Sequence, residues 1–152
     1  MKIRTDFVTN SSSSSFILAF KDKSTVLKEL ANGFDPDYLQ AFSRICEQIY
    51  CSESYSKEEA VESFVDEETC VIRHAIARHQ QGFGKSWREA WNYVESEEGK
   101  KQVESEISKR RKEFEKSLVG KDFIVEVEVD DYYAPAYVVE DCECCKAIFD
   151  HH

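Results

Sequence analysis

Apolar and polar positions in the first twenty residues follow the pattern of two short strands. The runs at 3–8 and 16–20 are rich in β-branched and aromatic side chains, which favour strands. The segment TNSSSSS between them is typical of a turn. We therefore predict an N-terminal hairpin. Five serines exceed what a two-residue hairpin turn needs, so part of the tract is expected to belong to the second strand.

From residue 24 to residue 118 the apolar spacing changes to that of amphipathic helices. Ser56 with Glu59, and Ser86 with Glu89, have the spacing of capping boxes that start helices. The predicted helices cover about 24–31, 36–51, 56–82 and 86–95, and a last one ends before Gly120. An interruption could fall at 66–69, and a kink or break is expected near 96–99.

After Gly120 the apolar spacing has a period of two, which predicts a strand over 123–130 with one buried face. Residues 137–139 are expected to return as a second strand, which gives a C-terminal hairpin. Strands at both ends and helices between them indicate an α+β fold. We expect an antiparallel sheet of about four strands, made by the two hairpins, packed against four to five central helices.

Length and composition are consistent with a single domain over residues 1–152. No apolar run approaches the roughly 18 residues that a membrane-spanning helix needs. Asp6 and the serines interrupt any apolar core of a signal peptide. We therefore expect a cytoplasmic protein with no membrane partner.

The formal net charge of −10 disfavours nonspecific binding to nucleic acid or anionic lipid. It favours a protein partner with a basic surface. The charge is uneven, because the segment 122–145 carries eight acidic residues and no lysine or arginine.

The predicted strand 123–130 is the first candidate partner-binding site. Glu126, Glu128 and Asp130 would project from one face about 6.8 Å apart, twice the rise per strand residue. Asp131, Glu140 and Asp141 would extend this acidic surface. The alternative interpretation is a solvent-facing side of a hairpin, whose charges discourage pairing between sheet edges.

The second candidate is a metal site near the C-terminus. Cys142 and Cys145 have the C-x-x-C spacing with which two thiolates reach one Zn²⁺, and His151 and His152 could complete a tetrahedral set. The other three cysteines outside this cluster form no second C-x-x-C pair. The alternatives are a mobile, reduced tail over 141–152 with no cofactor, or histidines left from a purification tag.

The serine tract is a candidate anion-binding loop. Its members are Ser11, Ser12, Ser13, Ser14 and Ser15. Their N–H and O–H groups could hold an anion, accept a phosphate or form a recognition tip, whereas in a paired strand they would be architectural.

Two further groups have simpler explanations. The basic cluster at 109–112 is spread around a predicted helix, and Glu106 stands four residues before Arg110, which favours an ion pair on a solvated surface over direct nucleic-acid binding. No catalytic motif accompanies the serines, the cysteines, His74 or His79. We therefore predict no catalytic residues, with a thiol or serine hydrolase as an alternative that needs a histidine beside a nucleophile.

The segment DFVTNSSSSSF resembles the opening of small uncharacterised proteins from Gram-positive bacteria and their phages or mobile elements. The resemblance covers about residues 1–20 and implies a bacterial or phage origin, without any activity or site. Together with the acidic charge, it suggests a non-enzymatic binding protein. One such role is an inhibitor or regulator of a host nucleic-acid-handling defence protein, similar to an anti-CRISPR protein. A zinc-binding structural module remains the other alternative.

Overall fold

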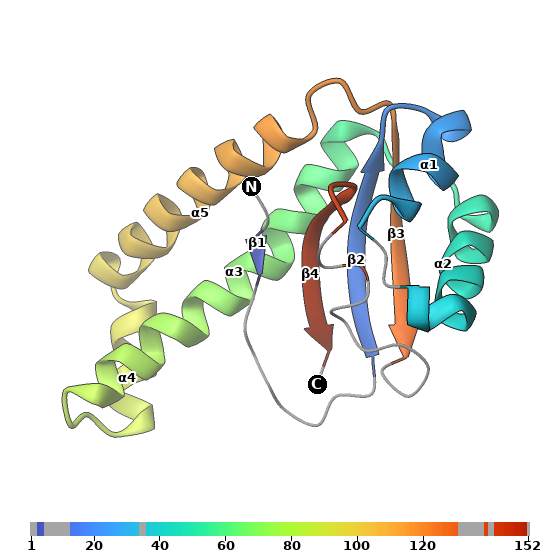
Figure 1. Ribbon diagram of the computed structural model, residues 1–152. Coiled ribbons are helices and arrows are strands. Elements are labelled where there is room, and N and C mark those ends of the chain that lie inside the picture. The colour runs from blue at the N-terminus through green and yellow to red at the C-terminus, as the bar shows by residue number, and fades with distance from the viewer. Residues whose placement is uncertain (1–2, 5–12, 34–35, 131–138, 140–141, 152) are drawn as a thin grey trace. The chain divides into compact units, whose positions relative to one another are not determined.

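The computed structural model describes residues 3–4, 13–33, 36–130, 139 and 142–151. These residues form an α+β structure with five α-helices and a sheet (Figure 1). The strands are β1 (Ile3–Arg4), β2 (Ser13–Phe20), β3 (Phe123–Asp130) and β4 (Cys145–His151). The helices are α1 (Val26–Ala31), α2 (Leu39–Cys51), α3 (Lys57–Gly82), α4 (Trp87–Glu95) and α5 (Glu97–Ser117), with short 3-10 turns at Lys23–Thr25 and Pro36–Tyr38.

Contacts divide the chain into two compact units. The sheet unit contains Met1–Ala60 and Phe114–His152, and the helical unit contains Val61–Glu113. The prediction of a single domain over residues 1–152 stays a prediction. No helix within the described ranges combines the length and the apolar character needed to cross a bilayer.

The strand order in the sheet is β1-β4-β2-β3. β2 is antiparallel to both β3 and β4, so the antiparallel part has three strands, and the two-residue β1 is parallel to β4. Figure 1 shows β4, β2 and β3 side by side, with α1 and α2 on one side of the sheet. The general α+β prediction is confirmed, but the antiparallel sheet of four strands is not.

The predicted N-terminal hairpin is wrong, because β1 pairs with β4, and β2 pairs with β3 and β4. In the predicted C-terminal hairpin, Val139 is buried and helical and does not belong to a strand, whereas 137 and 138 lie outside the described residues. The N-terminal hairpin does not form because β4 takes part in the sheet. β4 lies in the segment 141–152, for which a mobile tail was one interpretation. Its apolar residues enter the sheet between β1 and β2, where both neighbours satisfy its backbone.

One face of the sheet forms the main core of the sheet unit. Alternate residues of β2 and β3 point to this face, as the period of two predicted. They pack with apolar side chains of α1 and α2; the largest buried members are Phe16, Leu18, Phe20, Leu30, Ile45 and Ile49. Burial of each such side chain stabilises the fold by about 1.5–3 kcal/mol. Ile17 and Ala19, which alternate with them, are also buried, so the middle strand β2 reads as a continuous apolar run.

The helical unit contains a second, smaller core. Ile72, Ile76 and Ala77 of α3 pack with Ala90 and Val94 of α4. Partly buried aromatic and apolar side chains of α4 and α5 complete it: Trp91, Tyr93, Val103 and Ile107.

Helix α3 runs without interruption through 66–69, so the interruption considered there is absent. The predicted break after α4 is confirmed, since Ser96 is extended between α4 and α5. A Cβ at Gly99 would lie 2.1 Å from the Tyr93 carbonyl oxygen, so this junction requires glycine.

Candidate functional site

The outer strand of the sheet carries two residues of the predicted acidic surface whose side chains the structure describes. β3 lies at the edge of the strand order, and its Val125 and Val127 are buried on the core side. On the opposite side Glu126 is half-buried and Glu128 is exposed. The alternation along β3 therefore separates an apolar face from an acidic one, as predicted.

A glutamine side chain covers part of this edge. The Gln48 Oε1 atom of α2 accepts a hydrogen bond from the Glu128 N–H (3.1 Å), and its Nε2 donates to the Glu128 carbonyl oxygen (2.7 Å). The amide thus satisfies the two backbone groups that a further strand would use at this position. An edge closed in this way resists pairing with another chain.

The segment before α3 covers the edge further along. The Tyr55 N–H donates to the Ile124 carbonyl oxygen (2.7 Å), and the Ile124 N–H donates to Ser54 Oγ (3.3 Å). The Tyr55 hydroxyl donates to Glu126 Oε2 (3.2 Å). Burial, followed by the negative charges of Glu126 and Glu59, raises the pKa of Tyr55, so its hydroxyl stays protonated and continues to donate.

Glu59 is a second carboxylate whose charge acts on Tyr55. It belongs to the predicted capping box of α3, in which its carboxylate accepts from the Ser56 N–H (2.7 Å) and its own N–H donates to Ser56 Oγ (3.1 Å). These hydrogen bonds lower the pKa of Glu59. We call Glu59, Glu126 and Glu128 the acidic edge.

The other residues of the predicted acidic surface are less informative. Asp130 is the last residue of β3, so it lies on the predicted strand. Asp131, Glu140 and Asp141 lie outside the described residues. Of the predicted acidic surface, the structure therefore describes the side chains of Glu126 and Glu128. Glu59 was not predicted to belong to this surface, because it comes from the start of α3.

The serine tract contributes to the middle of the sheet. Ser13–Phe20 forms β2, which confirms that part of the tract belongs to the second strand, whereas Ser11 and Ser12 lie outside the described residues. Ser14 and Ser15 are buried, and their strand is paired on both sides. This position favours an architectural role for them over an open anion-binding loop.

The same strand bears on the hydrolase alternative. In the register, Ser13 stands opposite Asp130 on one side and opposite His151 on the other. This pairing concerns backbone positions, and the hydrolase alternative stays a prediction.

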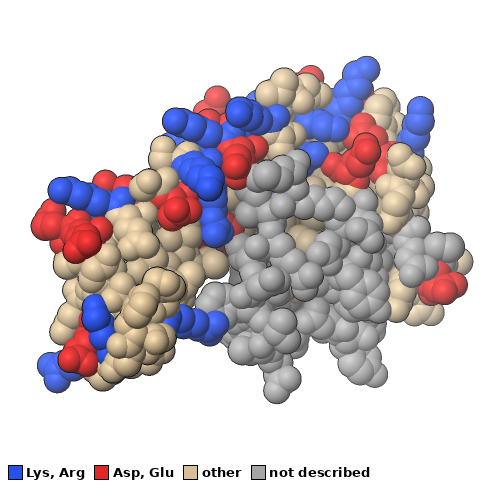
Figure 2. Space-filling view, turned by 60° about the vertical axis from the view of Figure 1, so that its left-hand side comes forward, with Lys and Arg blue, Asp and Glu red and all other residues tan. Residues whose placement is uncertain are grey.

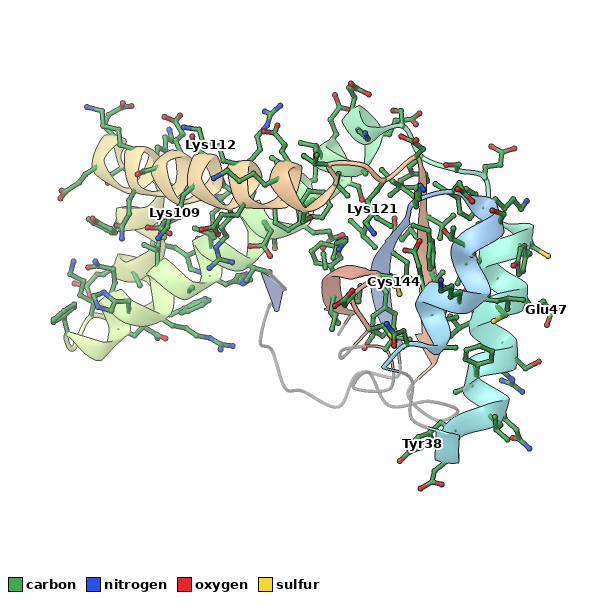
Figure 3. All side chains as sticks on the ribbon, turned by 45° about the horizontal axis from the view of Figure 1, so that its top comes forward. Tyr38, Glu47, Lys109, Lys112, Lys121 and Cys144 are labelled. Carbon is green, nitrogen blue, oxygen red and sulfur yellow. The ribbon has the colours of Figure 1, made fainter. Side chains whose placement is uncertain are left out.

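The C-terminal cysteines lie in the core. Cys142 Sγ donates to the Leu30 carbonyl oxygen (3.3 Å), and Cys145 Sγ contacts the Ala147 carbonyl oxygen (3.8 Å). A hydrogen bond with Cys142, together with burial, raises the pKa of Cys144 well above its ordinary value. Cys144 is labelled in Figure 3 within the sheet unit. Thiols that are protonated and directed to carbonyl groups behave as core residues.

The metal prediction gains no support from the described residues. Among them, no three histidine, cysteine, aspartate or glutamate side chains are grouped as a metal ion would require. His151 is a residue of β4, and His152 lies outside the described part of the chain. All six cysteines are present as thiols and not as disulfides.

The remaining candidates belong to the helical unit. His74 packs edge-on against Trp91, with ring centroids 5.1 Å apart, and burial lowers its pKa. In the basic cluster Arg110 pairs with Glu68 of α3, whereas the sequence predicted Glu106 as its partner. Lys109 and Lys112, labelled in Figure 3, are exposed on α5.

Comparisons with known proteins add no family to these observations. No protein-family model, curated protein or solved structure matches this chain.

Proposed function

We propose that this chain is a non-enzymatic binding protein whose acidic edge recognises a basic surface of a protein partner. The observation that carries the proposal is the set of hydrogen bonds along the edge strand β3. The Tyr55 hydroxyl donates to the Glu126 carboxylate, and the Gln48 amide occupies the backbone N–H and carbonyl oxygen of Glu128. Strand addition is blocked at Glu128, whereas the carboxylates remain at the surface. Recognition of this edge therefore depends on charge.

The expected energy of such recognition is modest for each contact. A solvent-exposed ion pair contributes about 0.2–1 kcal/mol, so two or three carboxylates supply specificity and not the whole affinity. The net charge of −10 adds long-range attraction for a basic partner and speeds their encounter. Binding should consequently weaken as salt screens the charges.

The resemblance of residues 1–20 to phage and mobile-element proteins directs the proposal to one class of partner. In this proposal the chain inhibits or regulates a host nucleic-acid-handling defence protein, because such proteins present the basic surfaces that the acidic edge fits. Its site of action is the bacterial cytoplasm, where reducing conditions keep thiols such as its six cysteines reduced.

The test compares two charge-reversed variants of equal net charge. Glu126→Lys/Glu128→Lys changes the acidic edge, and Glu104→Lys/Glu106→Lys changes two exposed acidic residues of α5. Each protein is immobilised, exposed to a Gram-positive bacterial lysate at low and high salt, and the captured proteins are quantified by mass spectrometry. We expect a basic protein that the parent chain and the α5 variant retain and that the edge variant captures about tenfold less. An identical captured set for all three proteins would contradict the proposal.

A further inference from the structure

A surface of opposite charge lies at the turn between α3 and α4. The first half of α3 is acidic, since residues 57–69 contain six acidic residues and one lysine. The segment 70–88 contains no acidic residue and carries four cations: Arg73, Arg78, Lys85 and Arg88. At the lower left of Figure 2, this end of the helical unit shows blue and tan side chains with a small red group, whereas red and blue are mixed along α5. The net charge of the chain therefore hides a local basic region.

The same turn presents large aromatic rings to solvent. Phe83 is 69% exposed and Trp87 is 45% exposed. The rings contact one another edge to face, with centroids 5.6 Å apart for Trp87 and Trp91 and 4.8 Å apart for His79 and Phe83. His74 contacts both tryptophans. We call these five residues, His74, His79, Phe83, Trp87 and Trp91, the aromatic tip.

The cations differ in how they are held. The Arg73 guanidinium lies 5.6 Å from the centroid of the Trp91 ring and pairs with Glu95. Lys85 Nζ lies 5.1 Å from the Tyr93 ring centroid. These two cations pack against the helices. Arg78 and Arg88 have exposed side chains at the tip, and the positive charge of Arg78 also acts on His74.

The acidic half of α3 is too distant to cancel this charge. At a rise of 1.5 Å per residue, Glu67, the last exposed acidic residue of this half, stands about 16.5 Å from Arg78 along the helix axis. The Debye length at physiological salt is about 8 Å, so roughly two screening lengths separate them. An anionic ligand at the tip therefore interacts mainly with the charges of the tip itself, which include the exposed carboxylate of Glu89 beside Arg88.

We propose that the aromatic tip binds single-stranded nucleic acid. Bases would stack on Trp87 and Phe83, while Arg78 and Arg88 contact phosphates. Cations and rings are interspersed along 78–88, which suits a polymer in which every unit has one flat ring and one negative charge. A duplex hides its base faces, so the exposed rings favour a single strand. This surface shares no residue with the acidic edge, and the inference stands without the proposed function.

The two tryptophans of the chain both belong to the tip, so their fluorescence reports on it directly. The probe is a 5′-labelled oligothymidylate, titrated with the full chain at low salt and followed by anisotropy and by tryptophan quenching. We expect saturable quenching, about tenfold weaker binding for Trp87→Ala, and a similar loss for Phe83→Ala. Arg78→Glu/Arg88→Glu should also lower the slope of log affinity against log salt by about 1.4, because two phosphate contacts disappear.

The matched control is Lys109→Glu/Lys112→Glu, which changes the net charge equally on exposed positions of α5. It should leave the affinity within about twofold. Circular dichroism confirms that each variant folds. Absence of quenching with the parent chain, or equal losses in the tip and control variants, would overturn the proposal. Equal affinity for duplex DNA, or displacement of the oligonucleotide by polyglutamate at equal concentration, would also overturn it and would indicate a general polyanion surface or an acidic protein partner.

Discussion

The buried ion pair in the helical unit permits a quantitative test of the structure. The Glu68 side chain is fully buried, its Oε2 accepts a hydrogen bond from Arg110 Nη1, and its Oε1 has no hydrogen-bond partner among the residues that the structure describes. Burial raises the pKa of Glu68, although the positive charge of Arg110 opposes the rise. A carboxyl with a raised pKa binds its proton more tightly in the folded state. Its contribution to stability is therefore lost as pH rises from the ordinary pKa through the raised one.

Arg110→Met removes the cation and leaves a buried carboxyl that must be protonated in the folded state. Protonating a group with an ordinary pKa of about 4.3 costs about 1.36 kcal/mol for each pH unit above that value. The variant should thus lose at most about 3.7 kcal/mol of unfolding free energy near pH 7 and about 1.6 kcal/mol near pH 5.5. The first value agrees with the 3–5 kcal/mol expected when one partner of a buried pair is removed. Glu68→Met, which removes the buried charge itself, should be neutral or stabilising.

The assay is urea unfolding followed by far-UV circular dichroism at both pH values, which stay above the isoelectric point of about 4.9. Lys109→Met removes an exposed neighbouring cation and should change the unfolding free energy by less than about 0.5 kcal/mol. The reasoning is refuted if Arg110→Met loses the same free energy at both pH values. A loss of more than about 2 kcal/mol in Glu68→Met would refute it as well.

Three further predictions concern the junction, the sheet edge and the thiols. Gly99→Ala should cost more than about 2 kcal/mol of unfolding free energy, because the added Cβ has no space. In the control Gly82→Ala the added Cβ meets nothing within 4 Å, so this variant should not be destabilised. Thermal unfolding of the two variants tests the difference. Gln48→Leu should cost about 1–3 kcal/mol and speed amide exchange at Glu128, unlike the exposed Gln40→Leu. Alkylation with iodoacetamide and mass spectrometry should label the exposed thiols in the folded protein and the buried ones only on unfolding; equal labelling would contradict the burial. The exposed thiols are Cys51 and Cys70, and the buried ones are Cys142, Cys144 and Cys145.

Local patterns predicted the elements of this fold better than their pairing. The alternation at 123–130 coincides with β3, and the capping box at Ser86 starts α4. A period of two says which face of a strand is buried but not which strand lies beside it. The chain therefore suggested two local hairpins, whereas β2 pairs with strands more than 100 residues away.

In the candidate sites, too, local patterns predicted single residues better than the tertiary contacts between them. Glu126 and Glu128 follow from alternation, but Gln48 and Tyr55 reach them through tertiary contacts that leave no local signal. Glu68 did leave a signal, since it stands four residues from both Phe64 and Ile72 on the apolar stripe of α3. The aromatic tip was not predicted, because the net charge of the whole chain conceals the basic segment 70–88.

The place of β2 between β3 and β4 has a consequence for synthesis on the ribosome. Ile17 pairs with Ala147, which is translated roughly 130 residues later, and at 5–20 residues per second the delay is about 6–26 s. For most of that interval the run FILAF has neither of its strand partners, because β3 is translated only after α3, α4 and α5 and shortly before β4. The nascent chain is thus exposed to aggregation at its first apolar segment, and the adjoining serines lower the hydrophobicity of that segment when it is most vulnerable.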